Sequence, residues 1–132
     1  MASHDTIGDF LTIIRNGYTA ELATVTAQWS KVREGIVRIL KENGYISDYT
    51  KGDSPAGLPV LAVQLKYNNR VPAIAGIKRV SSPGRRVYTG YTEIPKVIGG
   101  MGISILTTSR GLLSDRDARQ QKTGGELLAQ VW

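Results

Sequence analysis

The pattern of apolar residues changes near the middle of the chain, and this change constrains the fold more than any single motif does. Before Asn68, apolar residues recur at helical spacing in two segments and mark three extended segments. After Val71, the extended segments are short, and glycine, proline and serine separate them. A chain of 132 residues can bury a core of this kind. We therefore expect an α+β fold of two small packed lobes, residues 1–68 and residues 69–132.

The first lobe is expected to run helix, strand, helix, strand, strand. Asp5 is a good N-cap for a helix that ends near Asn16-Gly17, after an arm at residues 1–4. Ser30 caps a second helix, and Gly44 ends it. The buried stripe predicted for this second helix is Val32, Ile36, Ile39 and Leu40. The predicted strands are residues 24–27, 45–50 and 58–67, with a loop at 51–57.

The second lobe is expected to be mostly antiparallel strands with one or two short helices. Thr92 caps one predicted helix, which runs to Ile98, and Ser114 caps another, which runs to Gln121. Asp115 and Arg119 stand four residues apart on the latter and predict a surface salt bridge. The predicted strands are residues 73–79, 85–89, 103–107, 112–113 and 126–132, with a turn at 81–84.

The net charge of +6 comes entirely from the second half of the chain. Residues 1–66 hold seven Lys or Arg and seven Asp or Glu, whereas residues 67–132 hold ten against four. A basic half beside a neutral half is typical of a protein that faces a polyanion, although a solvated basic surface gives the same composition.

Catalytic and metal chemistry find little support in the sequence. There is no cysteine, and the single histidine, His4, lies in the predicted arm. Ser109 has Thr107 where a hydrolase nucleophile elbow needs glycine. We therefore expect no enzyme, cofactor or metal. The charged residues that interrupt the apolar stretches predict a cytoplasmic protein with no membrane contact.

A cluster of hydrogen-bonding side chains stands where a predicted strand ends: Thr107, Thr108, Ser109, Arg110 and Gly111. Hydroxyls, a forked cation and a glycine suit a polar, anionic partner such as RNA, but turns favour the same residues for backbone reasons. Upstream, Lys78, Arg79, Arg85 and Arg86 flank the turn at 81–84. They form either a basic hairpin tip or a solvated hairpin.

Two further residues of the basic half are ambiguous. Tyr88 either stacks on a base or faces the core. Glu126 either orients a loop by accepting backbone N–H groups or simply starts the last strand.

Ordered motifs along the whole chain resemble the ribosomal protein family numbered eight of the bacterial small subunit. In the second half these motifs are residues 78–88, Ile94-Pro95-Lys96-Val97, Gly102-Ile103, Thr108–Gly111, Asp115 with Ala118-Arg119, Gly124-Gly125-Glu126 and Val131-Trp132. In the first half they are Asp5 to Asn16, Ser30-Lys31 and Leu40 to Ile46. The family usually has a small residue and proline where this chain has Gln28-Trp29.

The resemblance implies a primary rRNA-binding protein of the small ribosomal subunit. Such a protein binds a helix in the central domain of 16S-type rRNA, supports platform assembly and neighbours other small-subunit proteins. In some bacteria the family also binds the mRNA of its own operon. The resemblance implies a ribosome of the cytoplasm and does not exclude an organellar one.

The family's signature loop, Ser-Thr-Ser-x-Gly, maps onto Thr107–Gly111, with threonine in place of the first serine. Tyr88 and Glu126 carry over as RNA-facing residues, and Arg15, Ser30 and Lys31 carry over as contacts from the first lobe.

Two other functions remain open from the sequence. The basic lobe of a protein-interaction module would dock an acidic partner, and that complex would survive nuclease treatment. An enzyme built on the hydroxyl loop would lose turnover on Ser109→Ala.

Overall fold

The computed structural model describes residues 5–132, so the predicted arm and His4 lie outside the described residues. The chain divides into two compact units, each described by itself. Unit 1 contains residues 5–8 and Ala75–Trp132, and unit 2 contains Asp9–Ile74. The predicted lobes, residues 1–68 and 69–132, stay a prediction, whereas the predicted α+β class is confirmed.

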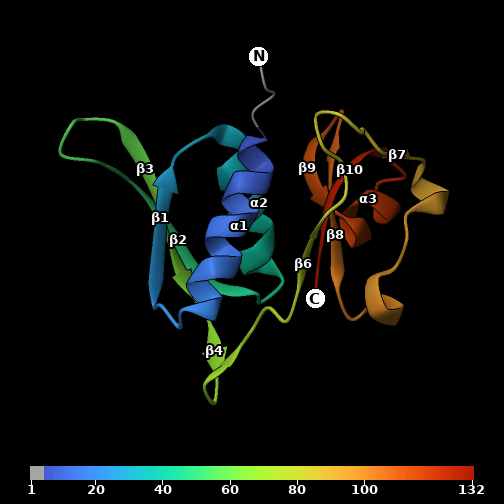
Figure 1. Ribbon diagram of the computed structural model, residues 1–132. Helices are drawn as coiled ribbons and strands as arrows, with labels where there is room; N and C mark the ends of the chain where they lie inside the picture. The colour runs from blue at the N-terminus through green and yellow to red at the C-terminus, as the bar shows by residue number, and fades with distance from the viewer. Residues whose placement is uncertain (1–4) are drawn as a thin grey trace. The chain divides into compact units, whose positions relative to one another are not determined.

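Unit 2 packs two helices against one face of a three-stranded sheet (Figure 1). The helices are α1 (Thr6–Thr19), which starts in unit 1, and α2 (Lys31–Glu42). The sheet has the order β1-β3-β2, all antiparallel, from β1 (Thr24–Gln28), β2 (Ile46–Asp53) and β3 (Pro59–Leu65). The core between the layers is aliphatic with one phenylalanine, and includes Phe10, Leu11, Ile14, Ile36, Val37, Ile39, Leu40, Leu61 and Val63.

Local chemistry explains where these helices begin. The Asp5 carboxylate accepts the Gly8 N–H (3.0 Å), and the Ser30 hydroxyl accepts the Arg33 N–H (3.1 Å). Both residues cap helices as the sequence predicts, although Gln28 and Trp29 depart from the family pattern just before Ser30. The buried stripe of α2 differs from the prediction, because Val32 is 40% exposed and Val37 is fully buried.

Helix ends and strand ends depart more from the local patterns. Helix α1 continues through Asn16-Gly17 to Thr19, because Glu21 and Leu22 supply the N–H groups that close it. Strand β2 continues to Asp53, inside the predicted loop, because it pairs with β3 as far as Pro59. The predicted strand 58–67 is divided, because β3 ends at Leu65 and Tyr67 belongs to a short hairpin, β4 (Tyr67–Asn68) and β5 (Val71–Pro72).

Unit 1 is built on a sheet in which β10 (Gly125–Val131) pairs with three other strands. The path runs β6-β10-β8-β9, and β7 also pairs with β10. These strands are β6 (Ile77–Arg79), β7 (Tyr88–Thr89), β8 (Ile103–Thr108) and β9 (Gly111–Ser114). Helix α3 (Asp115–Gln120) contributes Ala118 to a core with Ile94, Leu106 and Leu127.

A bulge at Leu128 changes which side of β10 is buried. Leu127 pairs with Leu106 and Ala129 pairs with Ile105, so Leu128 is an extra residue in β10. The extra residue lets Leu127 pack on one sheet face and Ala129 on the other. The Leu128 carbonyl accepts the Val80 N–H (2.9 Å) and a guanidinium N–H of Arg79 (2.7 Å).

The segment between β7 and β8 is not the helix predicted from Thr92 to Ile98. It forms a 3₁₀ turn, η1 (Tyr91–Glu93), and a kinked segment, η2 (Val97–Gly100), in which Ile98 and Gly99 have left-handed backbone (φ +46° and +61°). Pro95 disfavours helical backbone at the preceding residue, and Ile94 is extended (φ −63°, ψ 120°). Arg119 holds this segment by donating to the carbonyls of Ile94 (3.1 Å) and Pro95 (3.2 Å).

The ion pair of Asp115 and Arg119 forms as predicted (3.0 Å), but it is not a surface pair. The Asp115 side chain is only 5% exposed. Its carboxylate also accepts the Ser104 N–H (3.3 Å). The pair therefore ties α3 to β8 and to the 3₁₀ segment, a role that helical spacing alone does not predict.

Candidate functional site

Strand register brings three of the predicted site residues into one row of the unit 1 sheet. Glu126 on β10 stands opposite Tyr88 on β7 and opposite Thr107 on β8. Directly opposite residues of antiparallel strands project to the same face, so Tyr88, Glu126 and Thr107 share a face. The next residues along, Leu106 and Leu127, project to the other face and join the core.

Backbone contact between these strands is close because a glycine precedes β10 and another is its first residue. A Cβ on Gly124 would clash with the Thr89 carbonyl, and one on Gly125 would clash with the Thr107 carbonyl. The Gly124-Gly125 pair therefore lets β7 and β8 approach β10 and sets the spacing of the row.

Tyr88 is an exposed residue and not a core one. Its relative exposure is 71%, which is far above that of the buried tyrosine Tyr18 at 5%. An exposed aromatic ring beside cations can stack on an unpaired base. The core-facing alternative for Tyr88 is therefore wrong.

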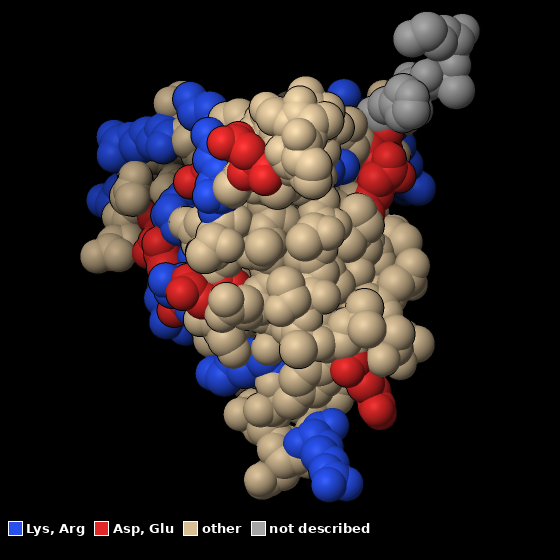
Figure 2. Space-filling model, turned by 90° about the vertical axis from the view of Figure 1, so that its left-hand side faces the viewer, with Lys and Arg blue, Asp and Glu red and all other residues tan. Residues whose placement is uncertain are grey.

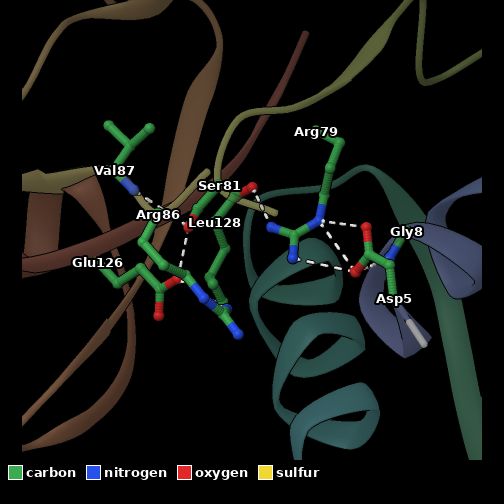
Figure 3. Close-up of polar contacts among 8 residues, drawn as sticks. All are labelled: Asp5, Gly8, Arg79, Ser81, Arg86, Val87, Glu126 and Leu128. Atoms are coloured by element: carbon green, nitrogen blue, oxygen red, sulfur yellow. Dashed lines mark hydrogen bonds and ion pairs between the residues drawn. The ribbon is translucent and has the colours of Figure 1, made fainter. Parts of the chain in front are cut away.

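Glu126 organises the turn at residues 81–86, which contains Arg85 and Arg86 and is called the basic turn below (Figure 3). Its carboxylate accepts the Ser81 hydroxyl and pairs with a guanidinium nitrogen of Arg86 at 3.1 Å. The Ser81 oxygen in turn accepts the Val87 N–H (3.2 Å). Glu126 thus orients a loop, as one alternative from the sequence had it, but through the hydroxyl of Ser81.

The hydroxyl segment Thr107–Gly111 forms the turn of the β8–β9 hairpin. Thr108 Oγ1 accepts the Arg110 N–H (3.0 Å) and donates to the Gly111 carbonyl (2.9 Å). Gly111 adopts φ +96°, where a side chain would be strained. Ser109 and Arg110 are exposed at the tip, and Thr107 and Thr108 are half-buried. The Thr108 hydroxyl therefore shapes the turn, and Ser109 is an exposed residue at its tip.

The structure does not gather the four cations predicted around the Ser81–Gly84 turn. Arg85 is exposed and closes the turn through mutual backbone bonds with Ser82 (2.9 and 3.0 Å). Lys78 on β6 lies opposite Gln130 on β10 in the strand register. Side chains alternate between the two sheet faces, and this register places Lys78 on the face opposite to that of Glu126. Arg86 forms an ion pair with Glu126, and Arg79 forms one with Asp5.

Arg79 is held in an internal ion pair with Asp5 (Figure 3). Its Nη2 and Nε atoms both donate to the carboxylate (3.1 Å each), and its side chain is 15% exposed. Burial acts to raise the pKa of Asp5, but the Arg79 and Gly8 hydrogen bonds lower it overall. The Arg79 guanidinium therefore has a structural role, since its N–H groups bind the Asp5 carboxylate and the Leu128 carbonyl.

The predicted first-lobe residues lie in unit 2 and make local contacts. Ser30 caps α2, and Lys31 is the exposed first residue of this helix. Arg15 is exposed on α1, and its carbonyl accepts the Thr19 hydroxyl (3.1 Å). Each of these residues is at the surface or at a helix terminus.

Sequence reasoning missed Ser81 as part of this site. Ser81 is fully buried and connects Glu126 to the backbone of the basic turn. The Ser81-Ser82-Pro83-Gly84 pattern indicates a turn, but the partner of Ser81 is 45 residues away in sequence. No local pattern reports such a pairing.

Within residues 5–132, no group of three or more His, Cys, Asp or Glu side chains is placed to hold a metal ion. In the same range, no helix has the length and apolar character needed to cross a membrane.

Comparisons with known proteins give one consistent result. The family model described as Ribosomal protein S8 matches residues 5–132. The small ribosomal subunit protein uS8 of Opitutus terrae is 54% identical over 128 residues, covering 97% of this chain and 98% of that protein. The proteins of the same name from Corynebacterium glutamicum and Rhodococcus opacus are 47% and 49% identical, and both alignments cover 100% of each chain.

A family match over all the described residues, together with relatives near half identity over their full length, leaves one assignment: this chain belongs to the ribosomal protein S8 family.

Proposed function

We propose that this protein is a structural, non-catalytic component of the small ribosomal subunit that binds rRNA, in the cytoplasm. The observation that carries the proposal is the row Tyr88, Glu126 and Thr107, with the exposed hydroxyl turn and Arg85 in the same sheet unit. Hydroxyls, an aromatic face and cations within one sheet unit suit the bases, riboses and phosphates of folded RNA.

The finer form of the proposal is that the bound RNA is a helix of the central domain of 16S-type rRNA, and that the protein supports platform assembly there. Neighbouring small-subunit proteins are further partners. An own-operon mRNA that copies the rRNA helix would bind the same face, so the two RNAs would compete.

The proposed RNA site contains residues from both predicted lobes, with 69–132 as the main RNA-binding lobe. Its members are Lys78, Arg79, Arg85, Arg86, Tyr88, Thr107, Thr108, Ser109, Arg110, Gly111, Glu126, Arg15, Ser30 and Lys31. The contacts described above divide their roles. Arg85, Tyr88, Ser109 and Arg110 are exposed and would touch RNA, whereas Glu126 and Arg79 would hold the surface in shape.

A titration of the full chain with a central-domain rRNA fragment tests the proposal. We expect Arg85→Ala to weaken binding about tenfold and to lower the slope of log affinity against log salt by about 0.7 to 0.9, the value of one phosphate contact. Ser109→Ala should weaken binding without changing the slope.

The matched control is Arg116→Ala, because Arg116 is exposed on α3 and outside the proposed site. Wild-type affinity and slope in both Arg85→Ala and Ser109→Ala would show the site to be wrong. Equal affinity of the wild type for an unrelated hairpin of the same length would show that the protein does not select this RNA.

A further inference from the structure

Unit 2 contains an open pocket that the proposed site does not use. Glu21, Tyr67 and Arg70 line it, and its volume is about 480 Å³. Pockets of a few hundred cubic ångströms accommodate small ligands. A carboxylate, an aromatic ring and a guanidinium therefore face one space large enough for a nucleotide.

Two of these three residues stand where the backbone favours glycine. Glu21 ends α1 with φ +57°, and its N–H and that of Leu22 donate to the carbonyls of Tyr18 (3.1 Å) and Gly17 (2.9 Å). This is the helix-ending motif in which the left-handed residue is usually glycine. The side chain of Glu21 is thus kept at a cost in backbone strain.

Arg70 breaks the equivalent rule in the β4–β5 hairpin (Figure 1). Asn69 and Arg70 form its two-residue turn with φ +52° and +67°. The second position of such a turn strongly favours glycine. Strained residues of this kind gather at binding sites, and here two of them line one pocket.

Tyr67 is fixed in place between them. Its hydroxyl donates to the Leu22 carbonyl (2.7 Å), and its ring packs edge-to-face on Tyr18 at 5.4 Å between centroids. Desolvation and then the charge of Glu21 raise the pKa of the Tyr67 hydroxyl. The ring is therefore preorganised, and Glu21 lies close enough to act on it.

The two charged residues are exposed and do not neutralise each other. Among the ion pairs of residues 5–132, none joins Glu21 to Arg70, and neither side chain is bonded to another charged residue. Opposite charges that line one pocket without meeting leave room for a ligand with complementary groups at its two ends.

We propose that this pocket binds a single unstacked nucleotide of RNA. Its base would stack on Tyr67, its phosphate would pair with Arg70, and an exocyclic amino group of the base would donate to Glu21. The inference rests on the proposed function for its RNA, but the pocket itself can be tested with free nucleotides.

The probes are cytidine 5′-monophosphate (CMP), uridine 5′-monophosphate (UMP) and cytidine, titrated into the labelled full-length protein with NMR detection. For the wild type we expect saturable shifts at Glu21, Tyr67 and Arg70. CMP should bind about tenfold more tightly than cytidine, which lacks the phosphate, and more tightly than UMP, which lacks the amino group.

Two glycine variants separate binding from folding. Arg70→Gly should raise the thermal unfolding midpoint, because glycine relieves the strain, while CMP affinity falls about tenfold to the level of cytidine. Glu21→Gly should also raise the midpoint and should remove the preference of CMP over UMP. Arg116→Ala and Glu93→Gln, exposed changes outside the pocket, should leave the nucleotide affinities unchanged.

Three results would overturn the inference: no saturable CMP shift at the pocket, equal affinity for CMP and cytidine, or unchanged CMP affinity in both glycine variants. Saturation by N-acetyl-arginine amide without saturation by CMP would assign the pocket to a protein side chain instead. None of these results depends on Arg85 or Ser109, so the pocket and the proposed rRNA site can fail separately.

Discussion

At the scale of single residues, Glu126 shows how a carboxylate can belong in a basic surface. It accepts the buried hydroxyl of Ser81 and the guanidinium of Arg86, and so holds the basic turn against β10. Its charge is used inside the protein and does not face the solvent, since its side chain is 14% exposed.

Replacing Glu126 tests this arrangement. Glu126→Ala should lower the free energy of unfolding by about 1–3 kcal/mol, because the buried Ser81 hydroxyl loses its acceptor. Glu126→Gln keeps an acceptor oxygen and should lower the free energy of unfolding by a smaller amount. Urea denaturation measures both, with Glu93→Ala as the exposed control. Equal losses for the alanine and glutamine variants would mean that the Ser81 contact contributes nothing.

Asp5 predicts a dependence of stability on pH. Its folded-state pKa is lowered from its ordinary value of 3.8, so its contribution is complete above that value and is lost as the pH falls through the lowered pKa. Asp5→Asn keeps a capping oxygen but removes the charge that Arg79 binds.

The variant should therefore be less stable than the wild type at neutral pH, and the difference should shrink as the pH falls below about 4. Thermal unfolding over a pH series measures this difference. A deficit of constant size down to the acid limit would rule out the ion pair as its origin.

At the scale of elements, caps decide where short helices form in unit 1. The Ser114 hydroxyl accepts the Asp117 N–H (3.3 Å) and starts α3, which the sequence predicts. The sequence also predicts a cap at Thr92, but this residue lies inside a 3₁₀ turn that has no side-chain cap.

A matched pair of variants compares the two positions. Ser114→Ala should lower the free energy of unfolding by about 1 kcal/mol, the usual value of an N-cap. Thr92→Ala, an exposed change with no cap to remove, should lower it by less than about 0.5 kcal/mol. Chemical denaturation of both variants gives the comparison. A larger loss of unfolding free energy for Thr92→Ala than for Ser114→Ala would indicate that Thr92 caps a helix, as the sequence predicts.

The sequence predicts these elements well where the cause is local and poorly where it is distant. Capping and periodicity locate α1, α2 and α3, because the determining residues lie within one or two turns. The length of β2 depends on its pairing with β3, and the position of Leu128 depends on β8. The local pattern predicts both partner strands, but it does not show which strands pair or in what register.

The same distinction applies to the site at the scale of the whole molecule. The hydroxyl turn and the basic half of the chain stand out in the sequence because their residues are adjacent. The row Tyr88, Glu126 and Thr107 depends on register, and the engagement of Arg79 depends on Asp5, 74 residues earlier. The pocket of Glu21, Tyr67 and Arg70 is assembled from two turns that lie far apart in sequence.

The central place of β10 also dictates an order of events during synthesis. All three strands that pair with β10 precede it in the chain, so the sheet of unit 1 cannot close until residues 125–131 have been made. Unit 2 needs only residues that precede Ala75. A nascent chain can therefore complete unit 2 while Tyr88 and Thr107 still lack the strand that aligns them. The surface proposed to bind RNA therefore needs residues 125–131, and the row of Tyr88, Glu126 and Thr107 forms only after this segment has been made.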